Sequence, residues 1–487
     1  MQVSEALGLQ KTQPELDFVD INLSTDTPLF LDPAALYDGN TPFAEACSRD
    51  LEEFFEAVLH AAMTSNDQLG MNLLRGLSEP DEIFLGFSEG SPQGRGVGEK
   101  QAQQIFSAMK RSKATTSGLI QDLNDALMFI PGIGPDKVSD ITVNIVRRHL
   151  ITYTQQQLEL HGFEIKNEMP TGLLWDSINS RWTQGYDYIP FIQRKKILLV
   201  PKRYVKYVAE FRKASQRYYD GFVANFIRQR ELSVMGHLVR FRERKDGSRT
   251  PWVPKEAIEK DTPRNKESVA EFSVRNPEVY KKFKNAFFRH NPESIHAIVA
   301  AEGGNFDYTK YVSNVIEALS NCPTGGRAAS DFQNIIVGII HFLLYPILTN
   351  PVLEKPANDG RKRIDISFEN EAALGVFARL RQDPFFEARE IMIECKNYSH
   401  DLENPELDQM IGRFDPRRGR FGVVVCRTIK DRGTLQKRCA DAFISRQGAI
   451  VVLTDEDLIE ALLAGPLGKE TRMNEIVQSQ LRSYRFA

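Results

Sequence analysis

Apolar residues recur at helical spacing over much of the first 158 residues. From Pro42 to about Thr64 they repeat every three or four positions, and Asn40 and Thr41 are suitable N-cap residues. Similar patterns predict further helices over 68–77, 98–113, 117–129 and 136–157, and a glycine-rich loop over 86–98. Residues 1–158 are therefore expected to form a mainly helical, all-α N-terminal domain.

The pattern changes over residues 159–322, for which we expect a mixed domain. Lys196 to Val200 is a short apolar strand candidate. Tyr204 to Glu231 has the spacing of a long basic helix, and 276–301 is helical again. Residues 241–267 are polar and contain Pro and Gly, which predicts a loop or a hairpin.

Helical and strand patterns alternate over residues 323–487. Strands are expected at 362–368, 389–396, 421–426 and 449–453, and helices at 330–348, 371–381, 405–414, 434–446 and 455–463. The last two strands are continuous apolar runs, typical of strands buried on both faces of a mixed sheet. The 22 residues between them hold a helix, which favours a right-handed crossover. We predict a C-terminal α/β domain with a central mixed sheet and a helical tail, in a multidomain α+β chain.

The net charge of −3 hides a strong segregation along the chain. Lys and Arg number 13 against 27 Asp and Glu over residues 1–190, 25 against 11 over 191–290, and 24 against 27 over the rest. The basic segment 191–290 either binds a polyanion, most commonly nucleic acid, or docks on the acidic N-terminal part of the same chain. Both readings stay open. The candidate nucleic-acid contacts in this segment are Arg212, Lys213, Arg217, Arg228, Arg230, Lys281 and Lys282.

The cysteines and the apolar runs bear on location. Five cysteines are scattered without paired or metal-ligand spacing, which predicts a reducing, cytoplasmic compartment and no zinc site. No signal sequence is recognised in the first residues. The longest apolar run, Ile335 to Leu348, contains His341 and Tyr345 and is too short to cross a bilayer, so no membrane partner is expected.

Two neighbouring strand candidates carry charged side chains suited to phosphodiester chemistry. Glu394 and Lys396 alternate with Ile393 and Cys395, so a carboxylate and an ammonium share one face of the strand. Asp365 on the preceding strand meets Glu394 if the two strands pair. Two carboxylates are hard ligands for Mg²⁺ (or Mn²⁺), and the main-chain carbonyl of Cys395 offers a further oxygen. Such a metal neutralises phosphate charge and lowers the pKa of a bound water, which a nearby lysine can orient.

An Asp, then Glu-x-Lys on the next strand, then a helix and another strand resembles the PD-(D/E)xK, or restriction-endonuclease-like (Mrr-like), nuclease superfamily. The resemblance covers about residues 325–460, under a third of the chain. It implies that Asp365 and Glu394 ligate Mg²⁺ and that Lys396 assists the attacking water. Many members carry a Gln-xxx-Arg pair on the following helix. Gln409 and Arg413 match it, and their spacing places both on one helix face.

The sequence departs from that family pattern in three places. No proline precedes Asp365. Between Asp365 and Glu394 lie 28 residues, more than a simple hairpin needs, so a helical insertion around 372–381 is expected. Asp331 is the only acidic candidate on the first helix of the domain. His400, just after the Glu-x-Lys strand, is interpreted as a surface loop residue.

A second, weaker resemblance concerns Phe129 to Val138, which joins two helical patterns through the turn Pro131 to Pro135. The turn resembles the hairpin of helix-hairpin-helix proteins, where backbone N–H groups face a DNA phosphate, and this implies Lys137 as a phosphate contact. Asp136 and Asp140 would oppose a phosphate. A tight helix–helix turn without a ligand is therefore the favoured interpretation.

The resemblance implies a cytoplasmic, Mg²⁺-dependent endonuclease of the type used in restriction or defence against foreign DNA. DNA is favoured over RNA as the substrate, and the sequence does not decide between the two. Two alternatives stay open. One is a non-catalytic nucleic-acid-binding protein on a nuclease scaffold. The other is a nuclease subunit that is silent until a regulatory partner or a second copy of the chain arrives. The complete set of Asp365, Glu394 and Lys396 favours catalysis.

Overall fold

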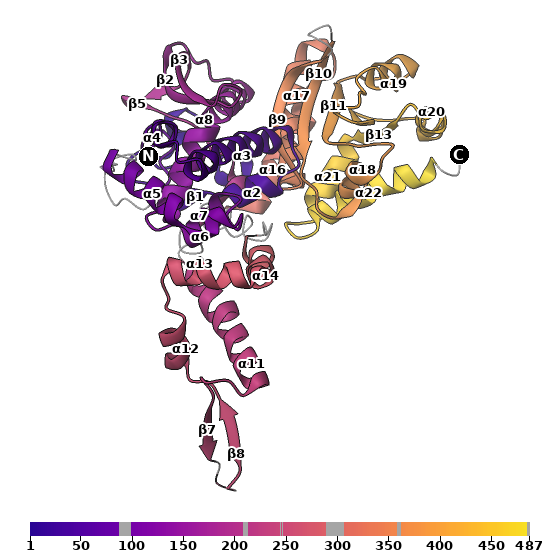
Figure 1. Cartoon of the computed structure of the whole chain (residues 1–487). Coiled ribbons are helices and arrows are strands. Elements are labelled where there is room, and N and C mark those ends of the chain that lie inside the picture. Colours follow the sequence, from indigo (N-terminus) through magenta and orange to yellow (C-terminus); the bar gives the residue numbers. More distant parts are fainter. Residues whose placement is uncertain are drawn as a thin grey trace.

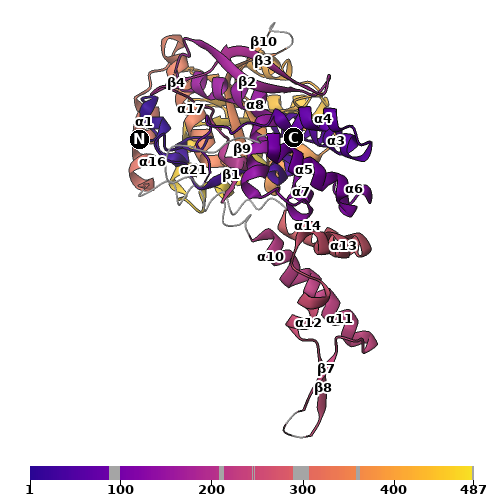
Figure 2. The ribbon, with the colours of Figure 1, turned by 60° about the vertical axis from the view of Figure 1, so that its left-hand side comes forward.

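The computed structural model describes residues 1–86, 99–207, 213–243, 245, 247–288, 306–357 and 362–484. Its architecture is multidomain, mixed α+β, as predicted. Three parts are visible: a helical N-terminal body, an arm that projects from it, and an α/β body that contains the C-terminus (Figure 1). The arm extends well beyond both bodies, as Figure 2 shows from a second direction.

The N-terminal body is mainly helical. Its helices are α1 (Val3–Ala6), η1 (Gln13–Glu15), α2 (Pro33–Asp38), α3 (Pro42–Met63), α4 (Asp67–Arg75), α5 (Glu99–Arg111), α6 (Lys113–Thr116), α7 (Leu123–Phe129) and α8 (Pro135–Leu160). The Thr41 side chain caps α3 by accepting from the Ala44 amide, and Pro42 occupies the first turn. One short strand, β1 (Leu29–Leu31), pairs with β6 (Val205–Tyr207). The predicted loop at 86–98 lies outside the described residues from 87 onward.

The next segment wraps the N-terminal body with short strands. They are β2 (Glu168–Asp176), β3 (Arg181–Tyr188), β4 (Phe191–Ile192) and β5 (Lys195–Lys196), followed by η2 (Lys202–Tyr204) and β6. The strand predicted at Lys196 to Val200 is wrong beyond Lys196. Residues 197–200 are buried, but their backbone hydrogen bonds go to separate segments, such as those of Glu82 and Val19, and form no strand. The hairpin of β2 and β3 packs on α8, so these strands share the core of the N-terminal body.

The arm is built from the basic segment. Its elements are α10 (Ala214–Tyr218), the π-helical turn η3 (Tyr219–Val223), α11 (Ala224–Val234), the hairpin β7 (Arg240–Glu243) and β8 (Arg249–Trp252), α12 (Lys255–Asp261), α13 (Lys266–Arg275) and α14 (Pro277–Phe287). The helix predicted from Tyr204 is wrong over residues 205–207, which pair with β1 instead. Residues 208–212 of that prediction lie outside the described residues, and helix is described again from Ala214. The stretch 241–267, predicted as a loop or hairpin, holds both a hairpin and α12.

The C-terminal body is a five-stranded mixed sheet between helices. Its elements are α16 (Tyr308–Asn321), η4 (Gly326–Ala328), α17 (Ala329–Leu344), β9 (Leu348–Ala357), β10 (Lys362–Asn370), α18 (Gly375–Gln382), β11 (Glu390–Lys396), α19 (Asn404–Ile411), β12 (Phe421–Cys426), α20 (Arg432–Ile444), β13 (Ala449–Thr454), α21 (Asp455–Leu463) and α22 (Lys469–Ser483). The strand order is β13-β12-β11-β10-β9. The strands β9, β10 and β11 pair antiparallel, whereas β11, β12 and β13 pair parallel.

Both faces of this sheet are covered, which explains the continuous apolar runs in β12 and β13. Ile393, Val423 and Val451 belong to one core together with residues of α17, α18, α21 and α22. The alternating residues Met392 and Val424 belong to a second, smaller core with residues of α19 and α20. The prediction of a central mixed sheet is confirmed.

The N-terminal body is bonded to the edge of this sheet. The Asp17 carboxylate accepts from the Tyr153 hydroxyl at 2.7 Å and from the Asn350 amide at 3.1 Å. The Tyr204 hydroxyl donates to Glu371 at 2.6 Å. Strand β9 is therefore covered by α8 and does not present an open edge. Within the described ranges, the helices fall short of the length and apolarity that a bilayer crossing requires.

Candidate nuclease site

Asp365 lies where the pairing of β10 with β11 ends. The last register pair is Ile366 with Ile393, so Asp365 and Glu394 are the next residues along the two strands. Here the Cys395 amide donates to the Asp365 carboxylate at 2.9 Å rather than to a backbone carbonyl. The sequence prediction that Asp365 meets Glu394 through neighbouring strands agrees with this register.

The strand geometry explains how Asp365 reaches across. Ile366 belongs to the core that contains Ile393, whereas Ile364 belongs to the core on the opposite face with Met392. Residues two apart normally share a face, so the regular alternation breaks at Asp365. The carboxylate is half-buried and lies at the rim of the sheet rather than inside either core.

Glu394 is fully buried, and three side chains surround its carboxylate. The Arg413 Nε donates to one oxygen at 3.0 Å, and the Gln409 amide donates to the other at 3.0 Å. The Lys396 Nζ lies 3.5 Å from that second oxygen and donates to the Gln409 oxygen at 2.7 Å. Gln409 thus bridges the Glu-x-Lys pair, and the four residues form one bonded cluster.

The helix α19 brings Gln409 to this cluster. Pro405 lies in its first turn, and Glu403 and Glu406 form a capping box. Met410 packs against β12 at Gly422, where a Cβ atom would collide with the methionine side chain, so the glycine permits this close approach. Gln409 is therefore held beside β11.

Arg413 departs from its predicted place, because α19 ends at Ile411. Arg413 lies in the turn that follows the helix, where the Arg418 guanidinium donates to its carbonyl oxygen at 3.0 Å. The prediction that Arg413 shares the helix with Gln409 is wrong by two residues. Its guanidinium still reaches Glu394, through Nε.

Burial and charge act in opposite directions on Glu394. Burial raises the pKa of Glu394, the negative charge of Asp365 raises it further, and Arg413 and Lys396 hold it down. Two carboxylates in one partly desolvated place repel each other. A bound cation would relieve that repulsion, as would the surrounding Arg and Lys side chains.

The donor set fits a hard divalent cation. Asp365 and Glu394 offer carboxylate oxygens, and each such oxygen has a second lone-pair direction beyond the hydrogen bond it accepts here. Burial and the two carboxylates raise the pKa of the Cys395 thiol well above its usual range, so this sulfur stays protonated and only the carbonyl is a plausible ligand. Among the described residues, His, Cys, Asp and Glu side chains form no group of three that could hold a metal ion. Magnesium bound here would complete its shell with waters and phosphate oxygens.

Sequence reasoning missed Gln333 of α17. Its amide donates to the main-chain oxygen of Asp365 at 2.5 Å, which ties the first helix of the domain to the site strand. Asp331, the acidic candidate of that helix, is exposed in its first turn. Asp331 and Gln333 are two positions apart in the sequence. Only the packing of α17 against the sheet shows that Gln333, rather than Asp331, contacts the site strand.

A second missed contact stabilises the end of β11. Arg427 donates to Asp455 at 2.7 Å and to the Asn397 side chain at 3.2 Å. Asn397 in turn donates to the main-chain oxygen of Gly325 at 3.1 Å. The residue after Lys396 is thereby fastened to the ends of the parallel strands, which keeps the Glu-x-Lys segment in place. His400 is exposed and stacks on Tyr398, in agreement with the surface interpretation.

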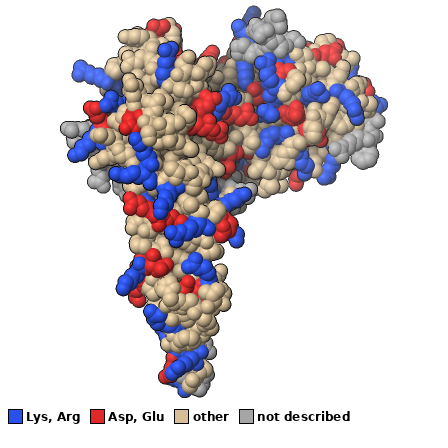
Figure 3. Space-filling view, in the orientation of Figure 1, with Lys and Arg blue, Asp and Glu red and all other residues tan. Residues whose placement is uncertain are grey.

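The candidate nucleic-acid contacts of the basic segment lie mostly at the surface. The exposed ones among them are Lys213, Arg217, Arg230, Lys281 and Lys282. Arg228 is half-buried and donates to Asn225 at 2.6 Å, and Arg230 lies 3.5 Å from Glu231. Arg212 lies outside the described residues. Lysine and arginine side chains are interspersed with acidic ones along the arm as far as its tip (Figure 3).

The alternative that the basic segment docks on the acidic N-terminal part is confirmed for the base of the arm. Lys284 of α14 pairs with Asp122 and Asp125 at 2.7 Å each. The Tyr280 hydroxyl also donates to Asp125 at 2.7 Å. The charge segregation therefore has a structural role here, while the exposed cations farther along the arm remain candidates for an external partner.

The turn from Pro131 to Pro135 joins α7 to α8, as its sequence predicts. Gly132 adopts a positive φ of 87°, which suits a glycine. The Lys266 ammonium donates to the carbonyl oxygens of Leu127, Ile130 and Ile133 at 2.5–2.9 Å, and burial lowers its pKa to about 8. Lys137 lies 3.7 Å from Asp140. These contacts hold the turn between the two helices.

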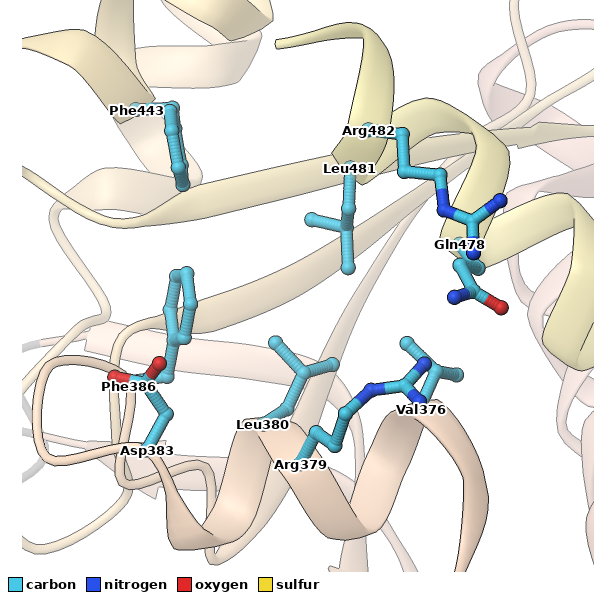
Figure 4. Close-up of a pocket in the computed structure, with 9 residues that line it drawn as sticks. All are labelled: Val376, Arg379, Leu380, Asp383, Phe386, Phe443, Gln478, Leu481 and Arg482. Carbon is cyan, nitrogen blue, oxygen red and sulfur yellow. The ribbon is translucent and has the colours of Figure 1, made fainter. Parts of the chain in front are cut away.

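A cavity of about 340 Å³ elsewhere in the C-terminal body contains none of the five predicted site residues. Leu380 of α18 and Leu481 of α22 point toward each other in it, and the Arg379 and Arg482 guanidinium groups lie beside Gln478 at one end (Figure 4). Its lining is mainly apolar and holds no paired carboxylates. It is separate from the cluster around Glu394.

Comparison with known proteins bears on the N-terminal body alone. Residues 8–211 match a family described as a domain of unknown function, DUF8370. No curated protein and no solved structure matches the chain. The matched segment ends before α10, so it excludes the arm and the sheet that carries Asp365, Glu394 and Lys396. The chain is thus similar to this family over its N-terminal body.

Proposed function

We propose that this chain is a metal-dependent endonuclease that hydrolyses DNA phosphodiester bonds, with a restriction-endonuclease-like catalytic domain at residues 323–487. One observation carries the proposal. A fully buried glutamate beside a second carboxylate is bonded to a lysine, a glutamine and an arginine that the PD-(D/E)xK resemblance names in advance. Such side chains on strands and helices usually occupy separate, solvated positions.

Each side chain of the cluster has a role that its chemistry supports. Asp365, Glu394 and the Cys395 carbonyl would hold Mg²⁺ or Mn²⁺, which when bound activates a water and neutralises phosphate charge. The Lys396 ammonium orients that water and stabilises negative charge as it develops. Among the described residues Arg413 bonds Glu394 through Nε, and its two terminal amino groups would fork onto a phosphate. Gln409 holds the Lys396 and Glu394 side chains in place by a hydrogen bond with each.

A second candidate, a nuclease subunit held silent until a partner arrives, is favoured by the same hydrogen bonds. Both Glu394 oxygens are engaged by Arg413 and Gln409. Metal binding then requires Glu394 to share or exchange these contacts. A partner protein, or the DNA itself, would promote this by drawing Arg413 toward a phosphate.

The other parts of the chain fit substrate binding in the cytoplasm. All five cysteines are free thiols, as a reducing compartment maintains them. The exposed cations of the arm provide a surface for a polyanion. A role in defence against foreign DNA belongs to this proposal by family analogy.

The proposal is tested by incubating the purified chain with supercoiled plasmid, linear duplex DNA and RNA, each with Mg²⁺, with Mn²⁺ and with EDTA. We expect nicking or linearisation of DNA with either metal and none with EDTA. Lack of cleavage of all three substrates with both metals would contradict an autonomous nuclease. Cleavage that persists in EDTA would contradict the metal dependence.

A further inference from the structure

The outermost feature of the molecule is the hairpin of β7 and β8 at the end of the arm (Figures 1 and 2). Arg240 to Glu243 are exposed, and so are Arg249 and Trp252 of the partner strand. An isolated two-stranded hairpin is marginally stable in water and normally needs a face to pack against. Neither face of this ribbon has a core residue, so its projection into solvent suits contact with another molecule.

The register divides the ribbon into two faces of different character. Arg240 lies opposite Trp252, and Arg242 lies opposite Thr250. These four residues share one face, because directly opposed residues point the same way and alternate residues repeat it. Its side chains are two arginines, a tryptophan and a threonine, so this face carries positive charge without a carboxylate.

The opposite face is internally neutralised. Phe241 lies opposite Pro251, and Glu243 lies opposite Arg249. The Arg249 guanidinium donates twice to Glu243, at 3.1 and 3.2 Å. The sole described acid of the two strands is therefore paired on this face. The name "cationic face" is used below for Arg240, Arg242, Thr250 and Trp252.

The arginines of the cationic face are held in place. The Arg242 guanidinium lies 4.8 Å from the Trp252 ring centre, a cation–π arrangement. Arg240 donates through one amino group to the carbonyls of His237 and Val239, at 3.0 Å each. Such contacts reduce the rotamer freedom that each arginine would otherwise lose on binding.

We infer that the cationic face binds a groove of double-stranded DNA, so that the arm serves as a DNA-reading element. The inference rests on the proposed function for DNA as the substrate. The major groove admits a two-stranded ribbon, and arginine forks onto guanine or onto phosphate oxygens. The segment 240–252 carries five Lys and Arg against two Asp and Glu, which suits a polyanion.

The test compares two arginines on opposite faces of the same hairpin, of which Arg249 pairs with Glu243 and Arg242 lies over Trp252. Equilibrium binding of a labelled 30-base-pair duplex is measured by fluorescence anisotropy on the full chain, in EDTA, at low and moderate salt. Arg242→Ala should raise Kd about fivefold or more and reduce the salt dependence by about one counterion. Arg249→Ala should stay within about twofold of the wild type, because its charge is already matched by Glu243.

Two results would overturn the inference. Equal binding by Arg242→Ala and the wild type would remove the cationic face from the interface. An equal loss in Arg242→Ala and Arg249→Ala would mean that net charge, rather than one face, attracts DNA. The readout is independent of cleavage. If the chain cleaves DNA and Arg242→Ala binds as well as the wild type, the nuclease proposal stands and the role of the arm is contradicted. If binding needs Arg242 but the chain never cleaves DNA, the role of the arm stands and the nuclease proposal is contradicted.

Discussion

At the scale of single residues, Glu394 is the centre of the account. It is the one member of the cluster that contacts all three polar partners, Lys396, Gln409 and Arg413. A buried carboxylate without such partners would be strongly destabilising. The partners therefore serve the folded protein as well as the proposed chemistry, so a test of their role has to read the rate of cleavage separately from stability.

The variant Arg413→Ala tests the role of this side chain in cleavage. Under the nuclease proposal the variant loses one charged contact to the phosphate, and single-turnover cleavage at saturating Mg²⁺ should slow about tenfold or more. Arg413→Lys should recover part of the rate, because a point charge replaces the guanidinium fork incompletely. Arg417→Ala, an exposed arginine in the next turn of the chain, is the matched control and should cleave at the wild-type rate. An unchanged rate in Arg413→Ala would show that this guanidinium makes no contact in the transition state.

Site residues could be predicted from the sequence only where both the residue type and its order along the chain were distinctive. Asp365 lies between two isoleucines, Glu394 and Lys396 end a mostly apolar strand, and Gln409 follows on the next helix. Gln333 has no such signal, since an amide in the first turns of a helix is ordinary. Its contact with Asp365 depends on how α17 packs across the sheet, which no local pattern encodes.

At the scale of elements, the most informative contact is the docking of α14 on α7. Asp125 of α7 is fully buried, and burial raises its pKa, as does the neighbouring charge of Asp122. Lys284 offsets both effects, and its own pKa is raised by Asp125 and Asp122 against the effect of burial. The arm is thus attached to the N-terminal body through an ion cluster in addition to apolar packing.

Lys284→Ala should weaken this attachment, because it leaves Asp125 with fewer partners in a desolvated place. We expect a loss of about 2 kcal/mol in the free energy of unfolding, less than for a fully buried pair since Lys284 is partly exposed. Urea unfolding followed by tryptophan fluorescence reports it, because Trp175 and Trp182 pack in the N-terminal body. Lys281→Ala, an exposed lysine one helical turn earlier, should unfold at the wild-type urea concentration. The same midpoint in both variants would contradict a stabilising role for the cluster.

The elements that the sequence predicted least well are those whose pattern is interrupted. Strand β9 contains Pro351 and Pro356 and was missed, although an edge position tolerates proline. The long helix expected from Tyr204 fails at its start because β6 pairs with β1, more than 170 residues earlier in the chain. The strands β10 to β13 were found because their apolar runs are continuous or alternate regularly.

At the scale of the whole molecule, the N-terminal body and the C-terminal sheet are joined by specific polar contacts. Asp17 is bonded to α8 through Tyr153 and to β9 through Asn350. The sequence could predict a multidomain chain from its length and its change of pattern, but not this junction, which depends on residues more than 300 positions apart. The DUF8370-like body therefore holds the edge of the sheet, and the arm extends from that body.

The most direct test of the central claim is single-turnover cleavage of plasmid DNA by Glu394→Gln at saturating Mg²⁺. Glutamine keeps the shape of the side chain but removes the charge that would hold the metal. Glu390→Gln, a buried carboxylate on the same strand that pairs with Lys355, is the control. The account predicts that Glu394→Gln cleaves about a hundredfold or more slowly than the wild type, while Glu390→Gln retains its rate. Cleavage by Glu394→Gln at the wild-type rate would contradict it.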